Sequence, residues 1–324
     1  MKLIIDMMGS DLGSKITVEG VNAFLKEHPD VTIFAVGRKE ELTTLNPQAI
    51  VVDARDIIPM DAGPLDVMRA KESSMLKSLN LYLSEEADGM VSAGGTGAYL
   101  SAATLKLKLI PGVERAALVS PFPTLRENHY VTILDIGANN ENTVSQLVQF
   151  AKMGQIYAKS VLNIENPGVF LLSNGSESGK GSPLIIETHK ALKERNFPNF
   201  KGNIEGRDAL NGEADVIVAD GFTGNIFLKT TEGIAKMIGK LLKDAFTERA
   251  SSKVGYLFAR KSIGNMKTKL DYKNTGGAML LGINGVVVKA HGSSDAIAFK
   301  NAIEVAYKMA RHGVIKEIKE KMNE

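Results

Sequence analysis

The amino-acid sequence predicts an α/β protein in which helices cover both faces of a mainly parallel sheet. Strand-like runs alternate with helix-like segments along nearly all of its 324 residues, as in folds built from βαβ units. Several runs are continuously β-branched, and Val286, Val287 and Val288 are an example, which is typical of strands buried on both faces. Glycine and small polar residues follow several of these runs. We therefore expect a three-layer α/β/α fold.

The predicted strands follow one another from the first residues of the chain almost to its end. They cover residues 3–6, 31–36, 50–53, 90–93, 116–120, 131–136, 169–172, 216–219 and 286–289. Helices are expected between them, with one at 98–108 and another at 296–310, the latter capped by Ser293, Ser294 or Asp295. Ligands of such sheets bind beyond the carboxyl ends of strands. The strand ends are therefore the places to look for a site.

Residues 233–272 are the least sheet-like part of the chain. Apolar residues at helical spacing from Ile234 to Ala245 leave Lys236, Lys240 and Lys243 on another face, which indicates an amphipathic helix. We expect a projecting helical element within a single catalytic domain spanning residues 1–324. A helix that only packs or dimerises is an equally open interpretation.

Composition excludes several classes of protein. A hydrophobic fraction of 44% excludes a mainly disordered chain, and the absence of cysteine excludes disulfides, zinc-thiolate sites and cysteine nucleophiles. The first residues, MKLIIDMMGS, contain an early aspartate and resemble a strand more than a signal peptide. No apolar run approaches membrane-spanning length. We expect a cytoplasmic protein.

Net charge is only +2, but basic residues concentrate between residues 249 and 273. This segment contains seven basic residues and a single acidic one, Asp271. Apolar residues lie among them, so this patch suits an anionic partner that also accepts apolar side chains. An anionic membrane surface and the acidic surface of another protein both remain open, and we do not expect a nucleic acid. The expected contact residues are Val254, Tyr256, Leu257, Phe258, Arg260 and Lys261.

The segment VSAGGTGA, residues 91–98, places Gly94, Gly95, Thr96 and Gly97 where a strand turns into a helix. Backbone N–H groups in such a turn can converge on a phosphate oxygen, because glycine permits close approach and the helix dipole favours negative charge. The segment matches neither the P-loop nor GxGxxG. A plain tight turn is as common an explanation as a phosphate cradle.

The loop SNGSESGKGSP, residues 173–183, has Lys180 as its single cation. A lone loop lysine is usually solvated. Its place between Gly179 and Gly181 nevertheless suits a flexible clamp for a phosphate or an oxyanion, and we carry Lys180 forward as a candidate catalytic residue.

Other strand ends supply further candidates. Lys289 and His291 follow the strand at 286–289, with Ser293 and Ser294 next in the chain. Asp220 and Asn225 follow the strand at 216–219, and Asn139 follows that at 131–136. His291 is the histidine with the most persuasive context, although a core or capping role stays open. Strand-end carboxylates could hold a metal, but for Asp6 and Asp135 we favour a structural role. We expect neither a metal nor a cofactor.

These motifs together resemble the PlsX family of phosphate acyltransferases over nearly the whole chain. The resemblance is carried by IDMMGSD (5–11), EADGMVSAGGTGA (86–98), LDIGAN (134–139), GNIEGRD (202–208), ADVIVADGFTGNIFLKTTEG (214–233) and GGAMLLGINGVVVKAHGSSDA (276–296). Departures are Met7 and Ser10 in the first motif, Gly95 in place of an asparagine, and Asn174, Ser176 and Ser182 in the loop.

The resemblance implies an enzyme that transfers a fatty acyl group from acyl-acyl carrier protein to inorganic phosphate, giving acyl phosphate for phospholipid synthesis. It also implies a fold like that of isocitrate and isopropylmalate dehydrogenases, a homodimer and peripheral membrane association. We expect direct transfer, with the turn at 94–97 holding phosphate and Lys180, His291 and Asn225 acting on the oxyanion and the leaving group. The phosphate or substrate contacts expected are Gly94, Gly95, Thr96, Gly97, Asn139, Asp220, Lys289, Ser293 and Ser294.

Three alternatives remain open at this point. A phosphotransacetylase-like enzyme would use an acyl-coenzyme A as donor. A nicotinamide-dependent dehydrogenase could share the fold, although no dinucleotide fingerprint supports it. A non-catalytic membrane scaffold would bind lipid without turnover.

Overall fold

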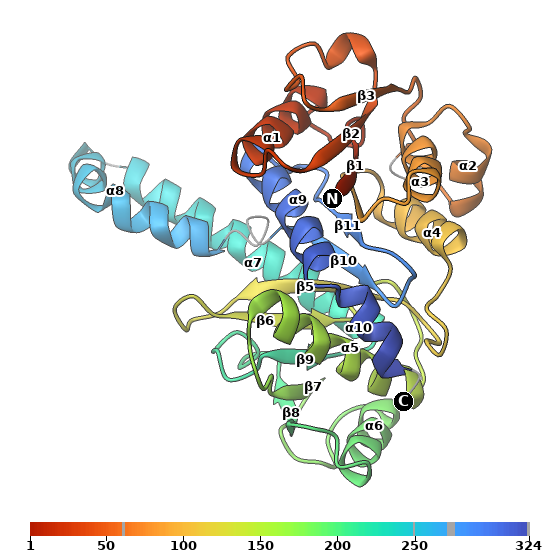
Figure 1. Cartoon of the computed structure of the whole chain (residues 1–324). Coiled ribbons are helices and arrows are strands. Elements are labelled where there is room, and N and C mark those ends of the chain that lie inside the picture. Colours follow the sequence, from red (N-terminus) through yellow and green to blue (C-terminus); the bar gives the residue numbers. More distant parts are fainter. Residues whose placement is uncertain (60–61, 249, 271–275, 323–324) are drawn as a thin grey trace.

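One 11-stranded sheet forms the middle of the molecule, and helices pack on both of its faces (Figure 1). The computed structural model describes residues 1–59, 62–248, 250–270 and 276–322. The strands lie in the order β3-β2-β1-β4-β11-β10-β5-β6-β9-β7-β8. This architecture confirms the predicted three-layer α/β/α class.

The elements have the following bounds. The strands are β1 (Lys2–Asp6), β2 (Thr32–Gly37), β3 (Ile50–Asp53), β4 (Gly89–Ser92), β5 (Ala117–Pro123), β6 (Tyr130–Leu134), β7 (Val169–Ser173), β8 (Phe200–Glu205), β9 (Val216–Val218), β10 (Ala278–Leu281) and β11 (Val287–Lys289). The helices are α1 (Ser14–Glu27), α2 (Pro64–Arg69), α3 (Ser74–Ser84), α4 (Thr96–Leu107), α5 (Val144–Leu162), α6 (Pro183–Glu194), α7 (Gly221–Thr247), α8 (Ala250–Leu270), α9 (Ala296–Arg311) and α10 (Val314–Met322).

The sheet consists of two parallel halves that run in opposite directions. β3, β2, β1, β4 and β11 share one direction, whereas β6, β9, β7 and β8 share the other. The reversal occurs through β10 and β5, which pair antiparallel with each other and with their outer neighbours. The strands of the two halves therefore run in from opposite edges of the sheet.

One row of directly paired residues across the sheet shows where the strands of the two halves end. In each half the row falls within two residues of the last residue of each strand, so strands of both halves end near the same line. It runs through Ala35, Ile5, Val91, Val288, Met279, Val119, Leu134, Val218 and Leu171. Loops that follow the two sets of strands consequently meet over the central strands.

Two hydrophobic clusters separate the layers. Along β1, Leu3 and Ile5 belong to the cluster under α1, α5, α6, α9 and α10, whereas Ile4 belongs to the cluster under α3 and α4. Successive strand residues point to opposite faces of a sheet, and both faces of β1 are buried. The continuous apolar runs of the sequence thus mark strands covered on both sides, as predicted.

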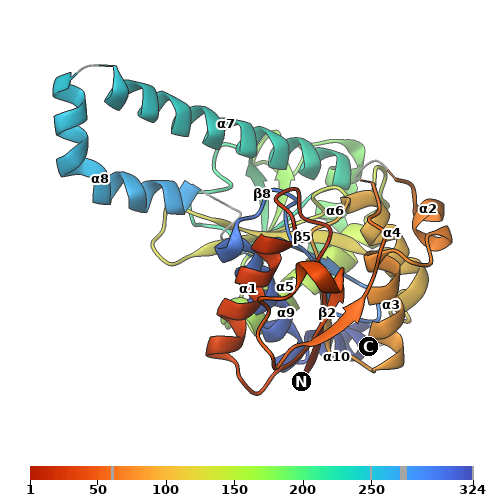
Figure 2. The ribbon, with the colours of Figure 1, turned by 90° about the horizontal axis from the view of Figure 1, so that it is seen from above.

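Helices α7 and α8 run antiparallel to each other and project away from the sheet (Figures 1 and 2). The projecting element was predicted to start at residue 233, but α7 starts at Gly221, capped by the Asp220 carboxylate. Residues 249, 271 and 272 of the predicted element, and the side chain of Val254, lie outside the described residues. In the described ranges, no helix combines the length and apolar character needed to cross a membrane.

Candidate active site

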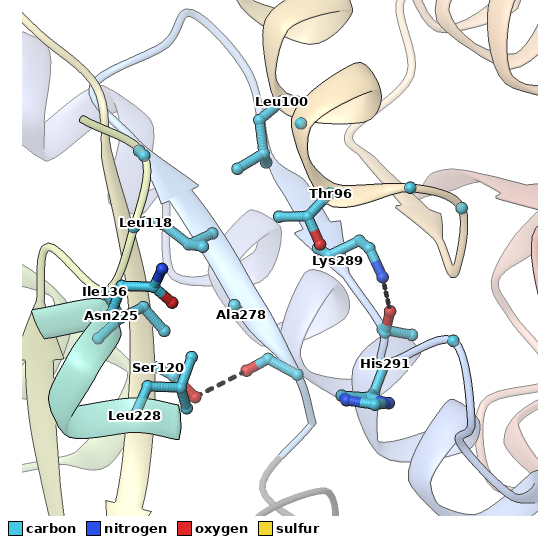
Figure 3. A pocket seen from close by; sticks show the side chains of 18 of the residues that line it. Thr96, Leu100, Leu118, Ser120, Ile136, Asn225, Leu228, Ala278, Lys289 and His291 are labelled. Atoms are coloured by element: carbon cyan, nitrogen blue, oxygen red, sulfur yellow. Dashed lines mark hydrogen bonds between the residues drawn. The ribbon is translucent and has the colours of Figure 1, made fainter. Parts of the chain in front are cut away.

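A cavity of about 600 Å³ lies over the central strands, between the first turns of α4 and α7 (Figure 3). Its floor is one face of the sheet. Lys289 pairs with Ala278, Leu118 pairs with Leu280 two residues further along the same strand, and Ser120 is two residues from Leu118. We call this cavity the cleft. The strand ends at residues 94–97, 136–138 and 289–292 meet there, together with Asn225 from the segment after β9.

One wall of the cleft is the turn Gly94–Gly97 at the N-terminus of α4. The N–H groups of the first turn of a helix have no intrahelical partner and carry the positive end of the helix dipole. The turn is held from beneath: Ser92 Oγ accepts the Gly94 N–H at 3.0 Å and donates to Asp6 Oδ2 at 2.7 Å. Asp6 is 1% exposed, and burial raises its pKa. The turn is thus fixed in place at the positive end of the α4 dipole, where an anion would be stabilised.

Lys289 lies beside this turn with only 8% of its surface exposed. Its Nζ donates to the carbonyl oxygens of Ala93, at 3.3 Å, and Ala290. Burial lowers the pKa of Lys289 to about 8, against the opposing influence of Asp11 and Asp6. Near neutral pH the cleft therefore holds a poorly hydrated positive charge that a phosphate dianion would neutralise.

His291 also lines the cleft, and Ser293 fixes its tautomer. The Ser293 N–H donates to His291 Nδ1 at 3.2 Å, and Ser293 Oγ lies 2.9 Å from the same atom. Because Nδ1 accepts, a neutral ring carries its proton on Nε2. The Ser294 N–H donates to the His291 carbonyl. Ser293 and Ser294 therefore position His291, and neither is among the residues that line the cleft.

The opposite wall comes from the loop after β6 and from α7. Asn225 lies there against Gly137, whose Cβ position would be 3.2 Å from the Asn225 side chain. Asp135 is fully buried, which raises its pKa, and it accepts the N–H groups of Gly137, Ala138 and Asn139. These contacts are those of a structural acceptor. The Asn139 amide donates to Asp135 and to the Ala116 carbonyl, so Asn139 supports the loop and does not line the cleft.

Lys180 and Asp220 lie outside the cleft. Lys180 is exposed on the loop between β7 and α6. Asp220 accepts from the Thr223 N–H at 2.9 Å and from its hydroxyl at 2.7 Å, as the N-cap of α7. Asp220 lines a second hollow on the other side of this helix. The catalytic role of Lys180 thus stays a prediction that the geometry of the cleft does not support.

Sequence reasoning missed Lys229 and Glu232, which α7 also contributes to the cleft. Lys229 Nζ lies 3.1 Å from Glu232 Oε2, and the Glu232 side chain is 8% exposed. Their spacing of three residues is a helical signal. It went unnoticed because the helix was expected to start after them.

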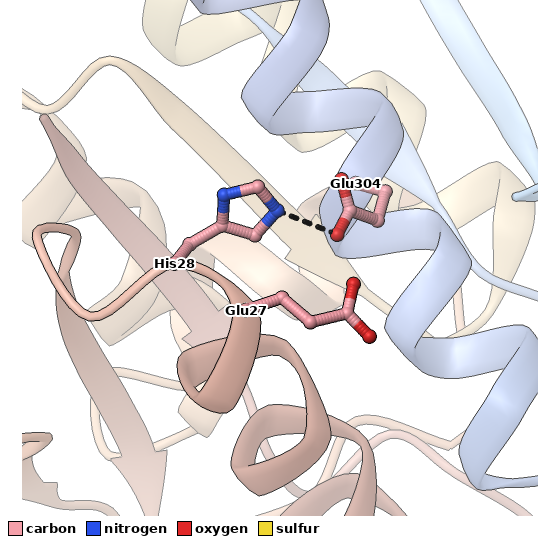
Figure 4. A group of neighbouring side chains, drawn as sticks. All are labelled: Glu27, His28 and Glu304. Carbon is pink, nitrogen blue, oxygen red and sulfur yellow. Dashed lines mark hydrogen bonds and ion pairs between the residues drawn. The ribbon is translucent and has the colours of Figure 1, made fainter.

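A possible metal ligand set lies away from the cleft. In the described part of the chain, Glu27, His28 and Glu304 place donor atoms within 4.8 Å of one another (Figure 4). Lys300 Nζ, however, is 2.6 Å from Glu27 Oε2 and 3.8 Å from Glu304 Oε1. The lysine already supplies a cation, so we interpret the group as an ion-pair network between α1 and α9.

The fold is shared with solved structures of low sequence identity. A phosphotransacetylase from Streptococcus pyogenes matches with a TM-score of 0.61 at 17% identity, covering 96% of this chain and 94% of that one. A 4-hydroxythreonine-4-phosphate dehydrogenase from Klebsiella pneumoniae matches with a TM-score of 0.52 at 12% identity, covering 96% of this chain and 99% of that one. The protein therefore has the α/β fold common to phosphotransacetylases and this class of dehydrogenase.

Within that class the chain belongs to the family described as "Fatty acid synthesis protein", whose model matches residues 1–317. A phosphate acyltransferase of Clostridium novyi is 42% identical over 327 residues, 98% of each chain. One of Geobacter sulfurreducens is 42% identical over 330 residues, 99% of this chain and 94% of the relative. The protein is thus an enzyme, an acyltransferase of fatty acid synthesis, and the resemblance to PlsX is confirmed.

A valine in place of Gly97 tests whether the turn Gly94–Gly97 binds phosphate. A Cβ built on Gly97 meets nothing within 4 Å, so the fold should survive, whereas the branched side chain would enter the cleft where an anion approaches the backbone. We expect the KM for phosphate to rise at least about tenfold with the KM for the acyl donor little changed. Steady-state kinetics with each substrate varied in turn measure this.

The matched control is Gly239→Val, since Gly239 is also a helical glycine with nothing within 4 Å of its Cβ position. An equal rise of both KM values in Gly97→Val, with the control normal, would contradict a specific role in phosphate binding. Gly94 is less suitable, because its Cβ would lie 2.5 Å from Met75 Cε.

Proposed function

We propose that the enzyme moves a fatty acyl group from acyl-acyl carrier protein to inorganic phosphate, releasing acyl phosphate and free carrier protein for phospholipid synthesis. The observation that carries the proposal is the pairing of the Gly94–Gly97 turn with buried Lys289 in one cleft. Both elements select an anion, and the relatives named phosphate acyltransferase support phosphate as that anion.

The proposed chemistry is direct attack of phosphate on the thioester. A phosphate oxygen forms a bond to the carbonyl carbon, the carbonyl becomes a tetrahedral oxyanion, and the carbon–sulfur bond then breaks to release a thiolate. A thiolate leaves readily, since thiols have a pKa of roughly 8.5, so orientation and charge placement are the main requirements. The turn and Lys289 hold phosphate, while His291 Nε2–H and the Asn225 amide stabilise the oxyanion.

The identity of the donor separates this proposal from its runner-up, a phosphotransacetylase-like enzyme that uses acyl-coenzyme A. The test is incubation of the pure protein with phosphate and either acyl-acyl carrier protein or acyl-coenzyme A, followed by detection of acyl phosphate. A clear preference for the carrier-protein thioester supports the proposal. Product from acyl-coenzyme A alone would favour the runner-up, and no product from either would favour a non-catalytic scaffold.

We further propose that the protein is a homodimer that binds anionic membranes peripherally through α8. Tyr256, Leu257 and Phe258 are 39%, 65% and 88% exposed on that helix, next to Arg260 and Lys261. Exposed apolar side chains beside basic ones suit the interface of an anionic bilayer, where each nearby basic residue contributes about 1 kcal/mol. Acyl carrier protein is the competing partner for this surface.

Glutamate at both Leu257 and Phe258 should abolish binding to anionic vesicles, because it removes apolar anchoring and adds negative charge at the surface. Turnover in vesicle-free solution should stay nearly normal. Vesicle co-sedimentation and a solution assay measure the two effects. The control is the double variant Leu83→Glu with Leu105→Glu, two other exposed leucines. Retained vesicle binding with a lost response to carrier protein would reassign the surface to carrier docking.

A further inference from the structure

The second hollow, of about 690 Å³, lies on the opposite side of α7 from the cleft. It is built at the carboxyl ends of β7, β8 and β9 and at the N-termini of α6 and α7. The loop with Lys180 contributes Asn174 and Gly181, the segment GNIEGRD contributes Arg207, and the start of α7 contributes Thr223. The motifs of the sequence that the cleft does not contain therefore converge on this hollow.

The lining of the hollow is amphipathic. Aliphatic and aromatic surface comes from Ile185, Ile226, Phe227 and Ile234. Hydroxyl and amide groups come from Ser173, Asn174, Ser182, Thr223, Thr230 and Thr231. A bare acyl chain gains little from so many hydroxyls, whereas a chain that alternates amide and aliphatic groups can use both kinds of contact.

Two buried polar atoms at this end of the sheet have no hydrogen-bond partner in the described part of the chain, Ser173 Oγ and Asn203 Oδ1. Asn203 is 6% exposed and uses its amide to hold the loop, donating to the carbonyls of Glu177 and Lys180. Buried polar groups are nearly always satisfied. Ser173 lines the hollow, so its unpartnered hydroxyl lies next to the space that a polar ligand would occupy.

Helix α7 connects the two sites. Asn225, Leu228 and Lys229 face the cleft, whereas Thr223, Ile226 and Thr230 line the hollow. These residues alternate within the first turns of a single helix. A ligand that lies in the hollow and passes over the start of α7 would deliver its end to the phosphate site.

We propose that this hollow binds the pantetheine arm of the thioester donor. The inference rests on the proposed function, since it assigns the donor to one side of α7 and phosphate to the other. The arm consists of amides, a hydroxyl and aliphatic groups and carries a phosphate at its far end. Arg207 is the cation of the lining, and it also contacts Glu205 and Asp208, whereas Lys180 lies in the adjoining loop next to Gly181. The loop of residues 173–183 thus serves donor binding.

Two tryptophan variants test this, because the chain contains no tryptophan. Thr230→Trp should obstruct the hollow and raise the KM for acyl-acyl carrier protein at least about tenfold, with the KM for phosphate unchanged. Ile234→Trp, at an exposed position of the lining, should change its fluorescence on titration with pantetheine 4′-phosphate. Leu105→Trp, also exposed and helical but remote from the hollow, is the control for both measurements.

Titrating Ile234→Trp with holo-acyl carrier protein, apo-carrier protein and coenzyme A identifies the source of the arm. A response to holo-carrier or coenzyme A but not to apo-carrier supports the inference. An unchanged donor KM in a folded Thr230→Trp, together with a silent Ile234→Trp, would overturn it while leaving acyl phosphate formation by the wild type intact. Failure of the wild type to form acyl phosphate would instead reject the proposed function, and the fluorescence titration would still test the hollow.

Discussion

Methionine in place of Lys289 is expected to lower kcat/KM for phosphate by about two to three orders of magnitude, the scale of losing one preorganised charged donor. Lys289 is buried beside the Gly94–Gly97 turn, so solvent only weakly screens the attraction between its ammonium and phosphate. Methionine retains the length of the side chain and removes its charge. The variant loses two hydrogen bonds to the carbonyls of Ala93 and Ala290, but it also loses the cost of burying a charge, so it should still fold.

The pH profile gives a second measurement for the same variant. The pKa of Lys289 is about 8 because of burial, and its charged form is the protonated one. The wild-type kcat/KM for phosphate should therefore fall as pH rises through about 8, and this decline should be absent from Lys289→Met. Lys300→Met, which removes a lysine from the α1–α9 ion-pair network, is the control. A Lys289→Met enzyme within a few-fold of wild type would remove Lys289 from the phosphate site.

Strand identity could be predicted where the chain is β-branched and buried on both faces, but two strands escaped prediction. β10 has the sequence AMLL, whose residues all have a high intrinsic helix propensity. β8, FKGNIE, lies at the edge of the sheet and contains Gly202 at φ +107°. Both strands form because a neighbouring strand offers a ladder of hydrogen bonds. Local propensity contains no information about that neighbour.

The start of α7 shows a second limit. The segment DGFTGN reads as a turn because glycine disfavours helix interiors, yet Gly221 and Gly224 lie in the first turns of the helix. A Cβ at Gly221 would overlap the Asn139 carbonyl oxygen, and one at Gly224 would overlap that of Asp135. The glycines are required by close packing of α7 on the loop after β6. Tertiary contact therefore decides a conformation that propensity argues against.

The assembly of the site was predictable in part. The turn of Gly94–Gly97, Lys289, His291 and Asn225 do meet in one cleft, because each follows or begins at a strand end. Placing Lys180 with them assumed that the loop after every strand reaches the middle of the sheet. The loop with Lys180 follows β7, which lies beyond β9 and away from the central strands, and it lines the hollow on the other side of α7. The order of the strands depends on long-range pairing, which no local motif reveals.

Asparagine in place of His291 is expected to lower kcat by about two orders of magnitude while phosphate binding, measured by calorimetric titration, is retained. Ser293 donates to Nδ1, so the Nε2–H of a neutral ring is the donor that can stabilise the oxyanion. Asparagine cannot extend an amide as far as Nε2, whereas glutamine can, so His291→Gln should recover part of the lost turnover. If the role of His291 were purely structural, His291→Gln would not have a higher kcat than His291→Asn.

The comparison needs a histidine variant that leaves the cleft intact. His312→Asn is suitable, because His312 is exposed and contacts the Ser160 carbonyl of α5, a helix that packs on the opposite face of the sheet from α4. We expect it to match the wild type. Loss of phosphate binding in His291→Asn, with kcat preserved at saturating phosphate, would place His291 on the phosphate side of the cleft. In that case Asn225 would be left to hold the oxyanion, and Asn225→Ala, assayed at saturating phosphate, would then have to show the larger loss of kcat.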